Sequence, residues 1–220
     1  MTTPDETKPG PWRRQTELVR GGTARSAFGE TSEAIYMTSG YVYETAEQAE
    51  AAFKGDLERF VYSRYANPTV SMFEERLRLL EGAEACRATA SGMAAVFAAL
   101  MCQLEAGDRV VAARALFGSC HYIIAEILPR FGIEVALIDG TDPEAWRAAL
   151  APGAACVFLE TPSNPTLEII DLAAVAALAR RAGARVIVDN VFATPLLQRP
   201  LELGADVVVY SATKIGRAHV

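Results

Sequence analysis

The sequence predicts an α/β fold with a mainly parallel sheet and helices on both of its faces. From about residue 70 onward, strand-like runs alternate with helical patterns, which is the order that gives a parallel sheet. The strands expected at 185–189 and 206–210 are mostly Val and Ile, as in strands that are covered on both faces. A length of 220 residues with 51% hydrophobic side chains is sufficient for one sizeable core.

Apolar residues spaced three and four apart predict the first two helices of this region. One runs from Val70 to Leu80 and ends near Gly82, and the next begins at Ser91-Gly92 and stops at Gly107. The remaining elements are expected to be a strand at 109–113, a helix at 120–130, a strand at 134–139, a helix capped by Asp142 with Pro143 at its first position, a strand at 155–160 and a helix at 171–181.

Residues 1–35 have a different character. They are rich in Gly, Pro, Thr and charge and show no sustained periodicity. The sequence therefore predicts an extended arm ahead of the α/β region.

Composition excludes several classes of partner. Lys and Arg number 21 against 27 Asp and Glu, a net charge of −6 without a basic cluster, so neither nucleic acid nor an anionic membrane is expected. No apolar run approaches a membrane span, and the polar N-terminus is not a secretory signal, which favours the cytoplasm. Cys86, Cys102, Cys120 and Cys156 form no C-x-x-C pair, so no metal is expected and all four are interpreted as buried thiols.

Unusual residues follow the expected strands, at the edge where parallel sheets bind their ligands. Strand 155–160 continues into Thr161-Pro-Ser-Asn-Pro165, strand 185–189 ends at Asp189, and strand 206–210 is followed by Ser211-Ala-Thr-Lys214. A carboxylate and an amine are therefore expected to meet at one edge of the sheet.

A Lys, a carboxylate and an anion site together are what a pyridoxal phosphate site requires. Lys214 is the candidate for the Schiff base with the aldehyde, and Asp189 is the candidate partner of the pyridine nitrogen. The phosphate would be held by the helix that opens at Ser91-Gly92-Met93, with hydroxyls from Ser211 and Thr213.

Each of these features also has an ordinary structural explanation. A Ser-Gly pair at a helix start can be only a cap, a Lys after a strand can extend into solvent, and an Asp at a strand end can begin a turn. Asn164 lies between Ser and Pro, so a turn explains it equally well. Tyr62 and Arg64 lie in a segment without assignable periodicity and suit either solvent or a phosphate. The joint occurrence at strand ends favours the cofactor, and a nicotinamide enzyme is disfavoured because no G-x-G-x-x-G follows a strand.

From about Trp12 to Lys214 the chain resembles the Cys/Met-metabolism family of fold-type I pyridoxal-phosphate enzymes. The motifs that carry the resemblance are Tyr62-Ser-Arg-Tyr-Ala-Asn-Pro-Thr69, Ala90-Ser-Gly-Met93, Glu160-Thr-Pro-Ser-Asn-Pro165, Val188-Asp-Asn190 and Tyr210-Ser-Ala-Thr-Lys214.

The resemblance implies a role for each motif residue. Lys214 would hold the cofactor aldehyde and transfer protons, Asp189 would pair with the ring nitrogen, and Asn164 would bond near the phenolic oxygen. Tyr62 and Arg64 would reach the phosphate of a neighbouring subunit, which implies a homodimer or tetramer with shared active sites. The phosphate contacts within one subunit would be Gly92, Met93, Ser211 and Thr213, and Phe117 would stack on the ring where many relatives have a Tyr.

The implied activity is γ-replacement in methionine biosynthesis, converting O-succinylhomoserine and sulfide to homocysteine and succinate. Gly10-Pro-Trp12, Leu18-Val-Arg-Gly-Gly22, Phe28-Gly-Glu-Thr-Ser-Glu33 and Ala115-Leu-Phe-Gly-Ser119 are most similar to this sulfhydrylase branch. Phe117 also favours it over the γ-lyases, because no phenolic proton carrier is present. Two alternatives to this reaction remain. In one the sulfur donor is cysteine instead of sulfide, and in the other the substrate is the acetyl ester of homoserine.

The resemblance also divides the chain. Residues 1–69 would be the arm and cofactor-contacting segment, residues 70–214 an incomplete cofactor-binding α/β domain, and residues 215–220 a non-native tail that reads like translated sequencing-adapter DNA. The family's C-terminal domain, which carries the arginine for the substrate carboxylate, would then be missing. The 220-residue chain is accordingly expected to be inactive, and a non-catalytic fragment that binds cofactor or dimerises is the alternative of another class.

Overall fold

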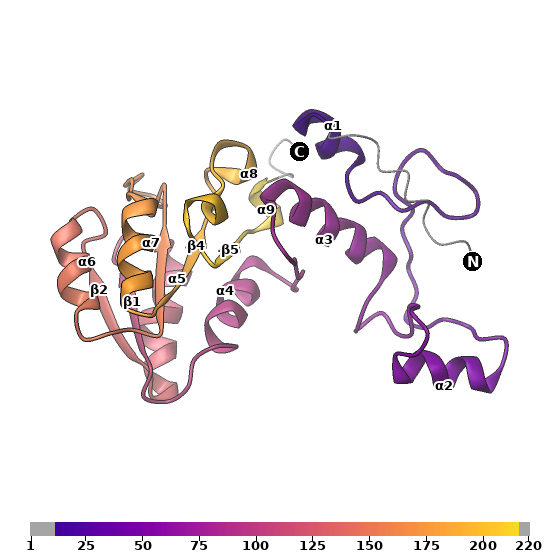
Figure 1. Ribbon diagram of the computed structural model, residues 1–220, viewed down its shortest axis with the longest axis horizontal. Helices are drawn as coiled ribbons and strands as arrows, with labels where there is room; N and C mark the ends of the chain where they lie inside the picture. The colour runs from indigo at the N-terminus through magenta and orange to yellow at the C-terminus, as the bar shows by residue number, and fades with distance from the viewer. Residues whose placement is uncertain (1–11, 216–220) are drawn as a thin grey trace. The chain divides into compact units, whose positions relative to one another are not determined.

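The computed structural model describes residues 12–215 (Figure 1). The beginning of the expected arm and all but the first residue of the expected tail lie outside the described residues. The chain divides into two compact units between Ala88 and Thr89, whereas the sequence-based boundary fell between residues 69 and 70. Among residues 12–215, no helix combines the length and apolar composition needed to cross a membrane.

The described part of the first unit, residues 12–88, contains three helices, α1 (Arg14–Arg20), α2 (Ala46–Lys54) and α3 (Pro68–Glu81). Helix α3 confirms the expected helix and starts two residues earlier, because the Asn67 side chain accepts a bond from the Thr69 N–H and Pro68 occupies the first turn. It ends at Gly82, whose φ of 68° is the left-handed conformation that glycine adopts without strain.

The expectation of an extended arm over residues 1–35 is wrong for residues 14–20, which form α1. Residues 14–20 show no helical spacing of apolar residues, and hydrogen bonds with α3 stabilise this helix instead. Arg14 donates to the Leu80 carbonyl at 3.0 Å, and Arg76 donates to the Gly21 carbonyl at 2.9 Å. Arg76 also forms an ion pair with Glu33, so the segment that follows α1 is tied to the same helix.

The second unit confirms the predicted α/β architecture. Its sheet is entirely parallel, in the order β2-β1-β3-β4-β5. The strands are β1 (Arg109–Ala113), β2 (Glu134–Ile138), β3 (Cys156–Glu160), β4 (Arg185–Asp189) and β5 (Val207–Val209). The helices are α4 (Gly92–Met101), α5 (Gly118–Tyr122), α6 (Pro143–Leu150), α7 (Leu172–Arg181), α8 (Thr194–Leu197) and α9 (Ala212–Ile215).

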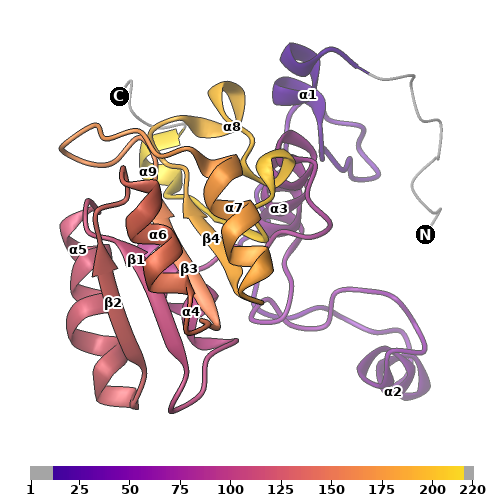
Figure 2. The ribbon, with the colours of Figure 1, turned by 60° about the vertical axis from the view of Figure 1, so that its left-hand side comes forward.

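Successive strand residues face opposite sides of the sheet, and each side has its own core. Val157 and Leu159 pack with α6 and α7, whereas Cys156 and Phe158 pack with α4 and α5. Figures 1 and 2 show these two helix layers on either side of the sheet. Because the strands are parallel, all of their carboxyl ends lie along one edge, as expected from the sequence.

Two helix boundaries differ from the expected ones. Helix α4 ends at Met101 instead of continuing to Gly107, and in the turn that follows the Asp108 carboxylate accepts the Glu105 N–H at 2.7 Å. The helix expected at 120–130 begins at Gly118 and passes into a π-helix (Ile123–Ile127) and a 3₁₀ helix (Leu128–Phe131). Pro129 has no N–H to donate, which prevents a regular α-helix at this end.

The four cysteines differ in how far they are buried. Cys120 and Cys156 are buried, Cys86 is half-buried, and Cys102 is exposed at the end of α4, so the expectation of four buried thiols is wrong for Cys102.

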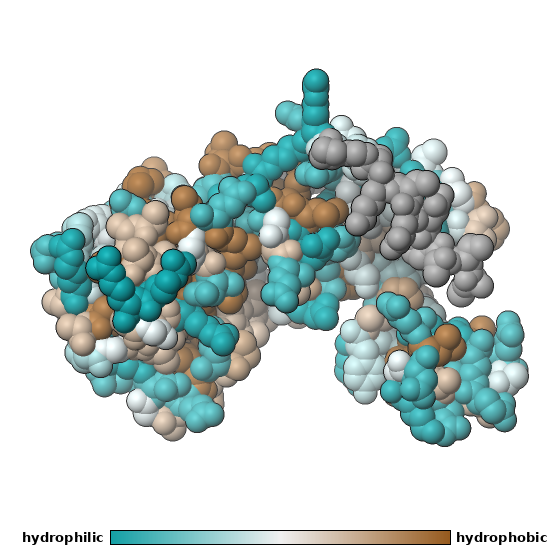
Figure 3. Space-filling view, in the orientation of Figure 1, coloured by the Kyte–Doolittle hydropathy of each residue, from teal (hydrophilic) through white to brown (hydrophobic). Residues whose placement is uncertain are grey.

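Hydrophobic side chains gather at the surface over α8, where Leu197 is exposed (Figure 3).

The cap of α7 gives a first test of these local interactions. Asp171 accepts the Ala174 N–H at 3.0 Å. We expect Asp171→Ala to lower the free energy of unfolding in urea by about 1 kcal/mol, and Asp171→Asn, which keeps a capping oxygen, to lower it far less. Equal losses in the two variants would show that the cap does not stabilise α7.

Candidate active site

A cavity of about 260 Å³ opens at the carboxyl ends of the strands of the second unit. The last residues of β3, β4 and β5, which are Glu160, Asp189 and Val209, line it. The start of α4, the start of α5 and helix α9 complete its wall. This is the edge at which the sequence predicted a ligand site.

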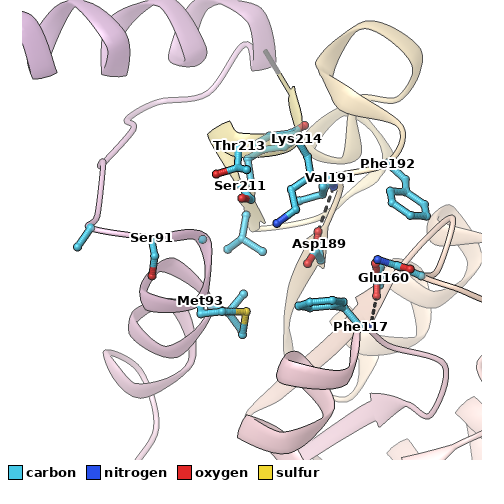
Figure 4. Close-up of a pocket in the computed structure, with 16 residues that line it drawn as sticks. Ser91, Met93, Phe117, Glu160, Asp189, Val191, Phe192, Ser211, Thr213 and Lys214 are labelled. Atoms are coloured by element: carbon cyan, nitrogen blue, oxygen red, sulfur yellow. Dashed lines mark hydrogen bonds between the residues drawn. The ribbon is translucent and has the colours of Figure 1, made fainter. Parts of the chain in front are cut away.

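The cavity brings together most of the predicted site residues (Figure 4). Those that line it are Gly92, Met93, Phe117, Asn164, Asp189, Ser211, Thr213 and Lys214. Tyr62 and Arg64 belong to the first unit, where the Arg64 guanidinium lies 5.0 Å from the centre of the Tyr62 ring.

Asp189 and Lys214 approach the cavity from neighbouring strand ends. Asp189 is 6% exposed, and its two carboxylate oxygens accept the Val191 N–H at 3.0 Å and the Cys120 thiol at 3.7 Å. The Lys214 amine is directed toward Asp189 (Figure 4) and lies 6.0 Å from the centre of the Phe117 ring. Burial raises the pKa of Asp189, while the Val191 N–H, the Cys120 thiol and the charge of Lys214 act in the opposite direction.

The start of α4 faces Ser211 across a very short gap. The Ser91 side chain accepts the Ala94 N–H at 3.1 Å, and the Ser91 carbonyl accepts the Ala95 N–H. The N–H groups of Gly92 and Met93 come before the first bonded N–H groups of the helix, at the end where a helix attracts anions. A Cβ atom on Gly92 would lie 2.8 Å from the Ser211 Cβ, so only glycine allows this approach.

Glu160 is a site residue that sequence reasoning placed within a motif without giving it a role. It is 2% exposed, and its carboxylate accepts the Phe117 N–H at 2.5 Å. Burial raises the pKa of Glu160 to about 7; the N–H of Phe117 lowers it, and the nearby Asp189 carboxylate raises it further. A Glu that ends a fully buried strand was the signal that could have identified it.

Asn190, directly after β4, forms a second feature that the sequence did not predict. Its side chain donates to the Tyr210 hydroxyl at 2.6 Å and to the Gln198 carbonyl at 2.9 Å. The Gln198 side chain in turn donates to Asn190 and to the Thr161 carbonyl. This network joins the segments that follow β3, β4 and β5, and therefore holds the loops carrying the site in one arrangement.

Comparison with known proteins identifies the family of the chain. Residues 15–219 match the model of the Cys/Met metabolism PLP-dependent enzyme family, so the chain belongs to that family. It is 61% identical over 196 residues to an O-succinylhomoserine sulfhydrylase of Mycobacterium tuberculosis, covering 89% of this chain and 48% of the relative. A protein of the same name from Pseudomonas aeruginosa is 49% identical over 199 residues, covering 90% and 49%.

The solved structures agree in fold. One is described as an O-acetylhomoserine (thiol)-lyase of Campylobacter jejuni that contains a pyridoxyl-lysine phosphate; its TM-score is 0.85 at 31% identity, over 92% of this chain and 50% of that one. A cystathionine γ-lyase from Micromonospora echinospora gives a TM-score of 0.83 at 38% identity, over 92% and 51%. The chain thus spans about half the length of the relatives it matches. Pyridoxal phosphate is the cofactor of this family.

The raised pKa of Glu160 gives a pH test of this site. Between pH 4.5 and about 7 the folded protein holds a proton that the unfolded chain releases, so the free energy of unfolding should fall as the pH rises. We expect Glu160→Gln to make this decrease in the free energy of unfolding smaller by up to about 3 kcal/mol. The measurement is urea unfolding at a series of pH values between 4.5 and 7.

A matched control is Glu75, whose pKa is lowered by its bond with Arg78 and which therefore titrates below this range. Glu75→Gln should leave the slope between pH 4.5 and 7 unchanged. A slope that Glu160→Gln does not alter would contradict the assignment.

Proposed function

We propose that this chain carries the cofactor site of an enzyme that replaces the ester group of O-succinylhomoserine by sulfide, giving homocysteine and succinate. The observation that carries the proposal is the meeting of Lys214, Asp189 and the narrow Gly92–Ser211 approach in one cavity. An amine, a buried carboxylate and an anion cradle are the parts that pyridoxal phosphate requires.

The residues fit the cofactor part by part. Lys214 would bind the aldehyde, Asp189 would hold a proton at the ring nitrogen, and Phe117 would offer its ring face. The position of Asn164 in the cavity suits the phenolic oxygen. The phosphate would be held by the N–H groups of Gly92 and Met93 and by the hydroxyls of Ser211 and Thr213.

When bound, the cofactor supplies an electron sink for the substrate Cα. Lys214, once its amine is free, would remove the proton from Cα and then a proton from Cβ. The electron pair left at Cβ would expel succinate as the Cγ–O bond breaks, sulfide would form the new Cγ–S bond, and the protons would return to Cβ and Cα. The burial of Asp189 strengthens its attraction for a cation at the ring nitrogen, because little water competes there.

The substrate assignment rests on relatives and on Phe117. Both sulfhydrylases compared above carry the succinyl ester in their names. Phe117 lacks a phenolic proton, which favours replacement by sulfide over elimination. We further propose that a second copy of the chain supplies Tyr62 and Arg64 to the phosphate, and that the protein acts in the cytoplasm.

The first test is to trap the cofactor. The chain's lysines are Lys8, Lys54 and Lys214. After incubation with pyridoxal phosphate and reduction with borohydride, peptide mass spectrometry should find the pyridoxyl group on Lys214. Lys214→Arg should abolish this adduct, whereas Lys54→Arg, at an exposed lysine paired with Glu50, should not. An adduct distributed equally between Lys54 and Lys214 would contradict the proposal.

A turnover assay distinguishes the proposed enzyme from the second candidate function, a unit that binds the cofactor without catalysis. Homocysteine and succinate formation from O-succinylhomoserine and sulfide would establish the γ-replacement activity. An adduct on Lys214 without turnover would instead identify a cofactor-binding unit that is not catalytic by itself.

The anion cradle has its own test. We expect Gly92→Ala to weaken pyridoxal phosphate binding at least tenfold, because its methyl group would force Ser211 away from the start of α4. Gly40→Ala is the matched control, since a Cβ there meets no atom within 4 Å and the residue has no positive φ. Unchanged affinity in Gly92→Ala, measured by absorbance titration, would exclude this cradle.

A further inference from the structure

Glu160 lies between two segments that the proposed function assigns to the cofactor. Its carboxylate accepts the N–H of Phe117, at the start of α5, at 2.5 Å. The backbone of Asn164, in the loop after β3, also acts on this carboxylate and lowers its pKa. The Glu160 side chain is buried, and Figure 4 shows its carboxylate beside Phe117, joined to it by this hydrogen bond.

Helix α5 depends on this contact for the position of its first turn. Phe117 is its N-cap residue, and a Phe side chain cannot accept a hydrogen bond, so the helix start has no cap of its own. Glu160 supplies a carboxylate from a neighbouring strand instead. A second contact holds the same short helix, since the Cys120 thiol donates to Asp189 at 3.7 Å.

The two carboxylates lie side by side. Glu160 and Asp189 are register partners on β3 and β4, and each fixes one point of α5. The Phe117 ring is thereby held at a set height above the sheet edge, 6.0 Å from the Lys214 amine. A stacked ring works only at a defined separation, so an error in the position of this helix would be transmitted directly to the cofactor.

We propose that Glu160 is a positioning residue that, through the Phe117 N–H, sets the Phe117 ring at the distance from Lys214 and Asp189 that the cofactor requires. The inference rests on the proposed function for its consequence, but the contact itself exists in the cofactor-free chain. The contact through which Glu160 acts is its hydrogen bond with the backbone N–H of Phe117.

Glu160→Gln and Glu160→Met separate the acceptor from the bulk of the side chain. Both variants have nearly the size of Glu, but only Gln retains an oxygen that accepts a hydrogen bond. Asp206 provides the matched control, because its carboxylate accepts the Val186 N–H at 2.7 Å at the opposite end of the sheet. Asp206→Asn and Asp206→Leu repeat the comparison away from the cavity.

The first readout needs no cofactor. In the ¹⁵N-labelled chain the Phe117 amide should exchange with solvent at least tenfold faster in Glu160→Met, and nearly as slowly as in the unsubstituted protein in Glu160→Gln. The amide proton shift of Phe117 in the unsubstituted protein should also titrate with Glu160, and Glu160→Gln should abolish that titration, a result available even if Glu160→Met fails to fold. Unchanged exchange together with a shift that does not titrate would overturn the inference.

The second readout uses the bound cofactor. Glu160→Met should lower the affinity for pyridoxal phosphate about tenfold and reduce its visible circular dichroism, Glu160→Gln should restore both, and the Asp206 variants should change neither. Equal affinity and dichroism in Glu160→Met and the unsubstituted protein would overturn the inference. An unsubstituted chain that gives no Lys214 adduct would overturn the proposed function instead, while the amide measurements would still decide whether Glu160 positions Phe117.

Discussion

Two buried carboxylates at neighbouring strand ends, Glu160 and Asp189, are the constraint on which the arrangement of the site depends. Burying one carboxylate without partners is costly, and burying two in adjacent register is more so. The protein compensates them with the N–H groups of Phe117 and Val191 and the thiol of Cys120. These bonds fix the start of α5 and the segment after β4, so the groups that stabilise the charges also shape the cavity.

The parallel sheet explains why chemistry collects at this edge. Every strand enters from the same side, and the covering helices fill both faces with apolar side chains. Polar residues that end the strands can therefore face only the cavity at the carboxyl edge, where Lys214 and the start of α4 meet them. The Asn190 network then joins three of the following loops, which keeps the donors and acceptors in place without a ligand.

The sequence was sufficient for the sheet and for the residues that follow its strands, because strand periodicity and parallel order alone bring Asp189 and Lys214 to one edge. It was insufficient where long-range contacts decide the outcome. Helix α1 forms on α3 through Arg14 and Arg76, although its own residues have no apolar period. The role of Glu160 depends on its register with Asp189 and its distance from Phe117, and neither quantity can be obtained from spacing along the chain.

A crystal structure of the chain with pyridoxal phosphate would test directly whether this cavity holds the cofactor. We expect electron density continuous with the Lys214 Nζ atom, a pyridine nitrogen facing Asp189, and a phosphate bonded to the N–H groups of Gly92 and Met93 and to the Ser211 hydroxyl. Density for the cofactor at any other place in the second unit, with this cavity empty, would contradict it.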